Sequence, residues 1–314
     1  MALTTVSLVI GGRTAATAQA RPPRAVASTG LALVLVLAAV ACSSGDDSGD
    51  GDSGATSDVA TPTTAPLIAA QSTGEQTINP GYRQGVASLP DGGWIFSGTT
   101  VLARTDGALE QAVADTTAVP DELAPEGYNH IGDVDVEDGV LYVPLEQPDY
   151  QTREQRMACY DPTTLTYEAS QPVEQRHNSF ISVDGDQAYS MEGFSGDQIL
   201  VYRVGDGCTF EPLEPIQMSA TVQRVQGADY FDGALWLATD DAQRGLYRVD
   251  LETGLVAPIG AMGHVADEGE GEGIDATSRP RGLLHVVNIV DTLDVRFEHF
   301  DVVEGADQRA VVEG

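Results

Sequence analysis

The sequence predicts an all-β protein, a β-propeller of five blades that follows a signal peptide and a disordered tether. One observation is a unit of about four short strands that recurs five times between residues 80 and 305. A second is an aromatic or histidine residue at the same place in each unit, with spacings of 48, 47, 47 and 49 residues. Repeats of roughly 40 to 50 residues with four strands are typical of propeller blades. Beyond residue 41, no segment shows convincing helical periodicity.

The first 41 residues are predicted to be a secretory signal peptide. Residues 31–41 are eleven consecutive apolar residues, about 16 Å of helix against a bilayer core of about 30 Å. Arg13, Arg21 and Arg24 precede them without any acidic residue, which is the pattern of a basic region followed by an apolar region. The alternative is a buried core helix.

The residues Ala39-Val40-Ala41-Cys42 resemble the lipobox of bacterial lipoproteins, where leucine is common at the position that Ala39 occupies. The resemblance implies cleavage before Cys42, a diacylglyceryl group on its thiol, and attachment to the outer face of the cell membrane. Two acyl chains are enough for stable anchoring. Cleavage without lipid attachment is the alternative.

Residues 42–71 are predicted to be a disordered tether, because they are rich in Ser, Gly and Asp and have almost no large apolar side chain before Leu67. Such a segment cannot bury enough surface to offset chain entropy. Its Asp-Gly alternation lacks the glutamate and flanking helices of a calcium-binding loop. The propeller domain is therefore expected at residues 72–314.

The chain is strongly acidic, with 48 Asp and Glu residues, 16 basic residues and a net charge of −32. This charge argues against a nucleic-acid partner and favours cationic partners or metal ions. The simpler interpretation is a general acidity of surface proteins in a salt-tolerant organism. Besides Cys42, the chain has Cys159 and Cys208, which in an oxidising compartment either pair as a disulfide or remain two buried thiols.

Each of the five units begins with a hairpin of two strands around a glycine-containing turn. These hairpins are GVASLPDGGWIFSGT from Gly85, GDVDVEDGVLYVPLE from Gly132, FISVDGDQAYSMEG from Phe180, GADYFDGALWLATDD from Gly227 and GIDATSRPRGLLHVVNIVD from Gly273. The recurring residues on their second strands are Trp94, Tyr142, Tyr189, Trp236 and His285. Two further strands complete each unit.

The alternatives to five blades are a β-sandwich, and a sixth blade built from residues 72–83 and the tail after Gly305. Closing the ring usually mixes N- and C-terminal strands in one blade, which covers strand edges.

The segments EDGVLYVPLE, LYRVDLETG and EGEGID resemble the extracytoplasmic propellers that include gluconolactonase-like, strictosidine-synthase-like and glutaminyl-cyclotransferase-like proteins. The resemblance covers most of residues 80 to 305 and implies a propeller fold. Many functions share this fold, so the resemblance alone assigns none of them.

In a propeller, the residues just before each innermost strand converge at one mouth of the central channel. Aligning the five units places polar side chains at that mouth in each of them. These are Gln84, Asn129, His130, Asp133, His177, Asn178, Gln226 and Glu272. We expect Gln84, His130, His177 and Gln226 to bind a ligand there.

Two metal sites are considered at the mouth. Glu272, Asp133, Asn129 and Asn178 offer the hard oxygen ligands that Ca²⁺ prefers, and Glu272 resembles a metal-binding glutamate of gluconolactonase-like enzymes. Alternatively, His130 and His177 with one carboxylate form an open zinc site. The simpler interpretation is that one histidine contacts a neighbouring blade and the other is exposed. The acidic stretch from Asp267 either holds a cation or is merely solvated.

The sequence contains no G-x-S-x-G, HExxH or CxxC motif and no phosphate-binding loop. We therefore expect a non-enzymatic module of the cell envelope that binds a ligand or partner. The alternative function is a calcium-dependent esterase or lactonase-like hydrolase with the metal at the channel mouth. A third is a scaffold that binds a partner protein through the blade edges.

Overall fold

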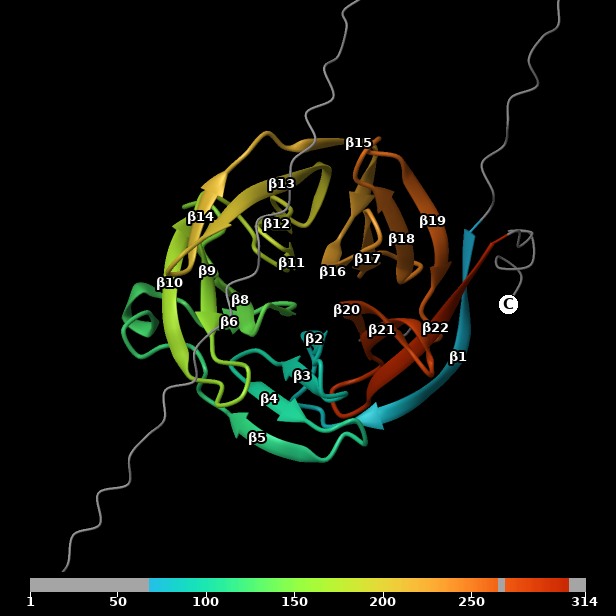
Figure 1. The fold of residues 1–314 in the computed structure, drawn as a ribbon, viewed down its shortest axis with the longest axis horizontal. Helices are drawn as coiled ribbons and strands as arrows, with labels where there is room; N and C mark the ends of the chain where they lie inside the picture. The colour runs from blue at the N-terminus through green and yellow to red at the C-terminus, as the bar shows by residue number, and fades with distance from the viewer. Residues whose placement is uncertain (1–67, 265–268, 305–314) are drawn as a thin grey trace, which may run out of the picture. The chain divides into compact units, whose positions relative to one another are not determined.

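The computed structural model describes residues 68–264 and 269–304. These residues form five β-sheets around a central axis, a five-bladed β-propeller (Figure 1). The predicted all-β fold and the predicted five blades are confirmed. The predicted signal peptide, Cys42 and the tether up to residue 67 lie outside the described residues. In the described part of the chain, no helix is long and apolar enough to cross a membrane.

Blades 1 and 2 follow each other along the chain. Blade 1 contains β2 (Gly85–Ser88), β3 (Trp94–Ser97), β4 (Leu102–Thr105) and β5 (Gln111–Asp115), from the channel outwards. A single-turn 3-10 helix, η1 (Ala124–Glu126), precedes blade 2. Blade 2 contains β6 (His130–Ile131) and β7 (Asp135–Glu137), both paired with β8 (Val140–Glu146), and then β9 (Gln155–Tyr160) and β10 (Tyr167–Val173). The break between β6 and β7 frees the backbone of Asp133, which forms a parallel bridge with Phe180 of the next unit.

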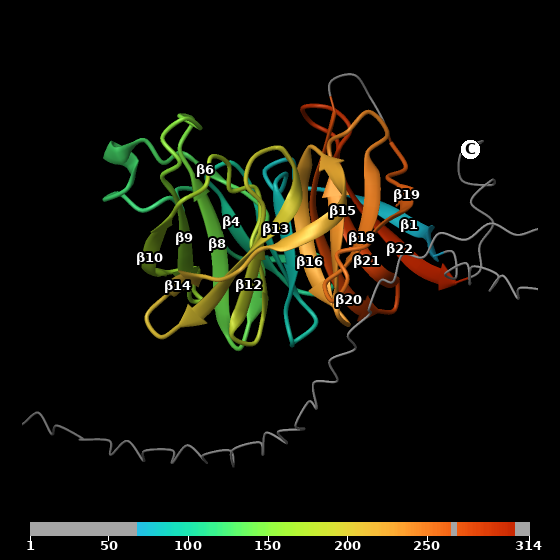
Figure 2. The ribbon, with the colours of Figure 1, turned by 90° about the horizontal axis from the view of Figure 1, so that it is seen from above.

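Blades 3 to 5 complete the ring, and their inner strands run roughly along the channel axis (Figure 2). Blade 3 contains β11 (Ser182–Asp184), β12 (Gln187–Ser190), β13 (Ser195–Gly205) and β14 (Thr209–Pro212), with β15 (Ile216–Gln223) also paired to β13. Blade 4 contains β16 (Val225–Phe231), β17 (Ala234–Thr239), β18 (Gly245–Asp250) and β19 (Val256–Ala261). Blade 5 contains β20 (Glu270–Arg279), β21 (Gly282–Ile289), β22 (Val295–Glu304) and, outermost, β1 (Ile68–Ile78).

The ring is closed by the N-terminal strand. β1 pairs antiparallel with β22, from Ile68 opposite Glu304 to Ile78 opposite Val295 (Figure 1). The mixing of N- and C-terminal strands in one blade is therefore observed, whereas the alternative of a sixth blade is wrong, because β1 completes blade 5. Residues 68–71, placed in the tether from their sequence, belong to β1, where they pair with residues 301–304 of β22.

The recurring aromatic position lies on the second strand of every blade, as the spacing predicts, and all five residues are buried. Its role is packing between neighbouring blades. Trp94 of blade 1 contacts His285 and Phe297 of blade 5, with ring centroids 4.9 and 5.0 Å apart. Tyr189 of blade 3 stacks on Tyr230 of blade 4. At these junctions, the residue at this position therefore packs against aromatic residues of the neighbouring blade, which explains its constant spacing.

Asp133 connects all five blades at the centre of the channel. Its Oδ1 accepts the N–H of Val86 in blade 1 at 2.9 Å, and its Oδ2 accepts the N–H of Ile274 in blade 5 at 3.0 Å. Its backbone bridges to blade 3. Gly227 of blade 4 leaves room for Oδ2, since a Cβ there would lie 2.5 Å from that oxygen. Burial raises the pKa of this carboxyl well above its usual value.

A second layer of carboxyl groups links neighbouring blades below Asp133. Asp135 Oδ2 accepts the N–H of Val183 at 2.6 Å, which joins blades 2 and 3. Asp229 Oδ2 accepts the N–H of Ala276 at 2.7 Å, joining blades 4 and 5. Asp275 Oδ1 accepts the N–H of Ser88 at 2.6 Å, joining blades 5 and 1. These residues occupy equivalent places on the inner strands, so a single position in the repeat provides the contacts.

This layer makes the stability of the propeller dependent on pH. Burial raises the pKa of Asp275 to about 8, and the nearby charge of Asp229 adds to the effect. Burial likewise raises the pKa of Asp229 to about 6. In the unfolded chain, both groups titrate near pH 3.9. The folded state therefore favours the protonated groups, and their contribution to stability is lost as the pH rises through about 6 and then about 8.

We predict that the urea midpoint of unfolding falls between about pH 5 and about pH 9, and that Asp275→Asn reduces this fall. Asp184→Asn on the exposed end of β11 is the matched control and should keep the slope of the wild type. A midpoint that rises with pH over this range in the wild-type protein would contradict the assignment.

Candidate functional site

A cavity of about 170 Å³ lies at the mouth of the channel. Its wall contains residues from all five units. They are Gln84, His130, Gly132, Tyr150, His177, Ser179, Phe194, Gln226, Glu270 and Glu272. We call it the mouth cavity. The structure thus brings together the four residues predicted to bind a ligand, and Glu272 with them. This convergence follows from the fold, because each of these residues lies at or just before the start of an inner strand.

Gln84 connects one wall of the mouth cavity to the other. Its Nε2 donates to the carbonyl oxygen of Arg83 at 3.1 Å and to Glu272 Oε1 at 3.0 Å. Both donor hydrogens are therefore used, and the amide oxygen of Gln84 is left to accept from His130 Nε2.

His130 links Gln84 to Glu146. Its Nε2 contacts the amide oxygen of Gln84, and its Nδ1 lies 2.9 Å from Glu146 Oε2. Each ring nitrogen therefore has an acceptor oxygen beside it. Glu146 is buried, and the ring of His130 is partly exposed.

Glu146 is shared by the two predicted histidines. His177 Nε2 lies 3.5 Å from Glu146 Oε1, the oxygen that also accepts the backbone N–H of Asn178. Burial acts to raise the pKa of Glu146, but the hydrogen bond from His130 and the electrostatic interaction with both imidazoles outweigh it and lower the pKa. Burial also lowers the pKa of His177, although the charge of Glu146 opposes this. Burial therefore disfavours the charged form of His177.

The sequence analysis missed Glu146. Its signal is the strand register, because His130 of β6 and Glu146 of β8 are direct cross-strand partners. Side chains directly opposite each other on paired strands are in contact. Extending the predicted pairing of the two strands back to His130 would therefore have placed Glu146 beside it.

An aromatic wall, also missed from the sequence, covers His177. Phe194 lies over the imidazole with ring centroids 3.8 Å apart, and Tyr150 meets its edge with centroids 5.2 Å apart. Tyr150 and Phe194 lie in connections between strands, where the repeat pattern predicts no side-chain position. Buried His177 Nδ1 has no hydrogen-bond partner among the described residues. A group that donates a hydrogen bond would satisfy this atom.

Glu272 and Glu270 form a carboxyl pair at the far wall. Burial raises the pKa of Glu272 well above its usual value, and the neighbouring Glu270 raises it further. Glu270 is exposed. Burial and the neighbouring Glu270 therefore favour the protonated form of Glu272, which can donate a hydrogen bond as well as accept one.

The four residues predicted to bind Ca²⁺ do not form a common site. Glu272 lines the mouth cavity, but Asn129 is exposed and outside its lining. Asn178 is fully buried, with its Nδ2 donating to the carbonyl oxygen of Arg156 at 2.8 Å. Asp133 is occupied by two backbone N–H groups of other blades. The residues present therefore do not fit the predicted calcium site, because Asn178 and Asp133 serve the fold and Asn129 lies outside the cavity.

The predicted zinc site at His130 and His177 does not form either. Both rings face the same carboxylate, Glu146, rather than a common point. Among residues 68–264 and 269–304, His, Cys, Asp and Glu ligand atoms gather within 4.8 Å of one another at a different place, Glu75, His264 and Glu298. Asp267 lies outside the described residues, so the acidic stretch stays untested.

The mouth cavity opens towards a wider cavity of about 590 Å³, which shares Tyr150, His177 and Phe194 with it. Two arginines of this vestibule, Arg153 and Arg176, form ion pairs with Glu192 at 3.0 and 3.5 Å. Asp197 also lines this cavity, so the two arginines are balanced by acidic residues and the rim carries no excess of positive charge.

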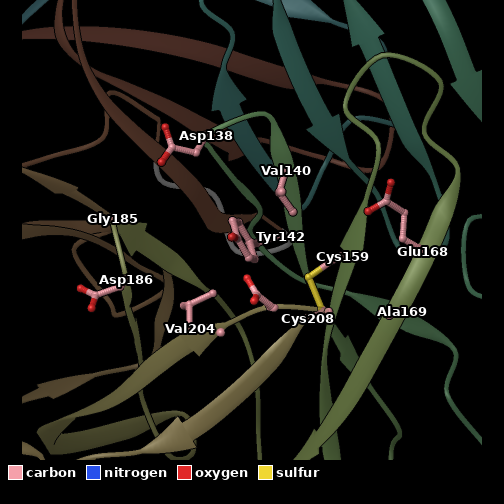
Figure 3. Close-up of a pocket in the computed structure, with 13 residues that line it drawn as sticks. Asp138, Val140, Tyr142, Cys159, Glu168, Ala169, Gly185, Asp186, Val204 and Cys208 are labelled. Atoms are coloured by element: carbon pink, nitrogen blue, oxygen red, sulfur yellow. A yellow bond between two sulfur atoms is a disulfide. The ribbon is translucent and has the colours of Figure 1, made fainter. Parts of the chain in front are cut away.

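A further cavity, of about 510 Å³, lies at the turn end of blades 2 and 3 (Figure 3). Cys159 of β9 and Cys208 of the β13–β14 turn form a disulfide in its wall, with Cα atoms 5.9 Å apart. Of the two arrangements that the sequence leaves open, the structure shows the disulfide. The lining contains the carboxylates of Asp138, Glu168 and Asp186 but no histidine. Although it is larger, this cavity lacks the varied hydrogen-bonding groups of the mouth cavity, which we therefore take as the candidate site.

Glu146→Gln tests the electrostatics of the site. Removing the carboxylate charge removes the effect that opposes burial, so the pKa of His177 should fall further. An NMR titration of the imidazole C–H signals measures it. Glu168→Gln, in the other cavity, should leave the titration of His177 unchanged. A pKa of His177 that rises in Glu146→Gln would contradict this geometry.

No protein-family model matches the chain, and no curated protein matches its sequence. Solved structures do resemble it. A glutaminyl cyclase from Myxococcus xanthus superimposes with a TM-score of 0.56 and 12% identity, over 76% of this chain and 100% of that one. Regucalcin, a calcium-binding protein from Agrobacterium tumefaciens, has a TM-score of 0.48 and 12% identity, over 77% and 93%. A gluconolactonase from Xanthomonas campestris has a TM-score of 0.44 and 12% identity, over 70% and 72%. The resemblance stated from the sequence is confirmed, and at this identity it concerns the fold alone.

Proposed function

We propose that this chain is a lipid-anchored, extracytoplasmic β-propeller that binds a small polar ligand in the mouth cavity as a module of the cell envelope. The observation that carries the proposal is the unsatisfied Nδ1 of His177 in a wall shared by the mouth cavity and the vestibule. A buried polar atom without a partner is costly. A ligand that donates a hydrogen bond to it would remove that cost.

The rest of the cavity defines the ligand further. Gln226 and the Glu270–Glu272 pair supply donors and acceptors, while Tyr150 and Phe194 supply an aromatic face. Arg153 and Arg176 of the vestibule are already paired with Glu192 and so do not define the charge of the ligand. A few polar groups beside an aromatic wall are typical of small-molecule sites. The ligand would be a compact polar molecule with a hydrogen-bond donor for His177 Nδ1.

Two features support the extracytoplasmic location. The sequence around Cys42 resembles a lipobox, and the disulfide between Cys159 and Cys208 suits an oxidising compartment. A tether between Cys42 and β1 would hold the propeller away from the membrane surface.

The ligand site is tested by thermal shift with a panel of amino acids, sugar acids, aldonolactones and short peptides. A ligand of the mouth cavity should raise the melting temperature of the wild-type protein. It should bind at least about tenfold more weakly to His177→Phe, which keeps the aromatic packing but removes Nδ1, and to Gln226→Leu. Calorimetry would then give the affinities.

Gln243→Leu, an exposed glutamine outside the cavity, is the matched control and should bind as the wild type does. The proposal fails if no member of the panel binds, or if every binder is held equally well by His177→Phe and Gln226→Leu.

The alternative is an esterase or lactonase-like hydrolase, and one observation favours it. Glu272, whose pKa is raised by burial, lies beside Glu270 in one cavity, and a pair of carboxyl groups is the kind of arrangement that supplies an acid and a base. Its calcium dependence has less support, because the predicted ligands do not gather. In the same thermal-shift experiment, a stabilisation by CaCl₂ that disappears in Glu272→Ala would favour this hydrolase over the binding module.

A further inference from the structure

Three potential metal ligands meet where the ring closes. Glu75 is on the closing strand β1, Glu298 is on its partner β22, and His264 follows β19 of blade 4. One ligand atom from each lies within 4.8 Å of the other two. This closure cluster is unrelated to the mouth cavity, whose lining includes none of the three residues.

Glu298 is the buried member of the closure cluster, at 2% exposure. Its Oε2 accepts the N–H of Gly263 and its Oε1 accepts the side-chain amide of Asn288, both at 2.6 Å. Among the described residues, no basic side chain forms an ion pair with it. A buried carboxylate without a counter-charge is costly unless a cation compensates it.

Asn288 gives an independent indication. It is fully buried, and its Nδ2 donates to Glu298 Oε1 and to the carbonyl oxygen of His264 at 3.0 Å, so the amide is directed at the closure cluster. Its Oδ1 has no hydrogen-bond partner in the described residues. An orphaned amide oxygen beside an uncompensated carboxylate is the environment that a cation, or a water bound to it, would satisfy.

The ligand types select the metal. An imidazole with two carboxylates suits zinc and similar transition metals, whereas calcium prefers oxygen ligands alone. His264 Nε2 now lies 2.6 Å from Glu75 Oε2. Tetrahedral zinc would widen this separation to about 3.3 Å. The side chains of His264 and Glu75 are 40% and 35% exposed, so both can rotate and the ion can enter from solvent.

Arg296 is the nearest competing cation. Its Nη1 donates to Glu75 Oε1 at 3.0 Å, while its Nε and Nη2 donate to Asp294. It therefore occupies the oxygen of Glu75 that faces away from His264 and leaves Oε2 for a metal. The contact also orients the carboxylate towards the closure cluster.

We propose that Glu75, His264 and Glu298 bind one zinc ion, which fastens the closing strand β1 to β22 and to the end of blade 4. β1 is otherwise an outer strand held by β22 on one side. It is also the strand next to the predicted tether. A metal at this place would therefore resist the opening of the ring from its N-terminal end.

The test is calorimetric titration of the metal-free protein with ZnCl₂ in a non-chelating buffer. The wild type should bind one zinc ion per chain, and CaCl₂ should give no comparable binding. Glu75→Gln and His264→Asn should each weaken zinc binding by at least about 100-fold. At a free zinc concentration of about 100 times the dissociation constant, the melting temperature of the wild type should rise by about 5 to 10 °C.

Glu304→Gln at the end of β22 is the matched control and should bind zinc as the wild type does. Because Glu75 and His264 are partly exposed, their variants should fold with unchanged circular dichroism, even if Glu298→Gln does not. The proposal is overturned if millimolar zinc does not bind, if both variants bind it as tightly as the wild type, or if binding is lost in His130→Asn but kept in His264→Asn.

Discussion

The carboxyl group of Asp133 is the contact on which the rest of the propeller depends. It accepts backbone N–H groups from the first and last blades, and its own backbone bridges to the third. Glycines of blades 1, 4 and 5 make room for it, since a Cβ at Gly273 would lie 2.3 Å from its Oδ1. One side chain thus fills the channel at this level. Its neighbour Gly132 lines the mouth cavity, so Asp133 also fixes the depth of the candidate site.

Above this level polar groups line the mouth cavity, and below it they hold the blades together. The mouth cavity combines two histidines and a carboxyl pair, which together offer several hydrogen-bonding patterns in a small volume. The layer of Asp135, Asp229 and Asp275 instead uses its oxygens on backbone N–H groups of adjacent blades. The same repeat therefore places similar residue types in two roles, which differ in their hydrogen-bond partners.

The sequence predicts the blades well because each repeat carries a local hairpin signal and a buried aromatic at constant spacing. It also predicts that Gln84, His130, His177 and Gln226 lie at the same mouth of the channel, because the inner strands begin at regular intervals along the sequence. It does not predict Tyr150 or Phe194, because loops have no period. The predicted calcium ligands do not gather for a related reason. The sequence shows that Asp133 and Asn178 are polar, but not that backbone groups already occupy their side chains. The disulfide stayed open because its cysteines are at inequivalent positions.

The most direct test of the central role of Asp133 is the free energy of unfolding of Asp133→Ala, measured by urea titration beside Asp184→Ala, an exposed aspartate of β11. Losing the acceptor for two buried N–H groups should cost about 2 to 6 kcal/mol. The backbone amide hydrogens of Val86 and Ile274 should exchange with solvent much faster in Asp133→Ala than in Asp184→Ala. If the free energy of unfolding of Asp133→Ala lies within about 0.5 kcal/mol of the wild-type value, as is usual for surface substitutions, Asp133 is not the contact that holds the blades together.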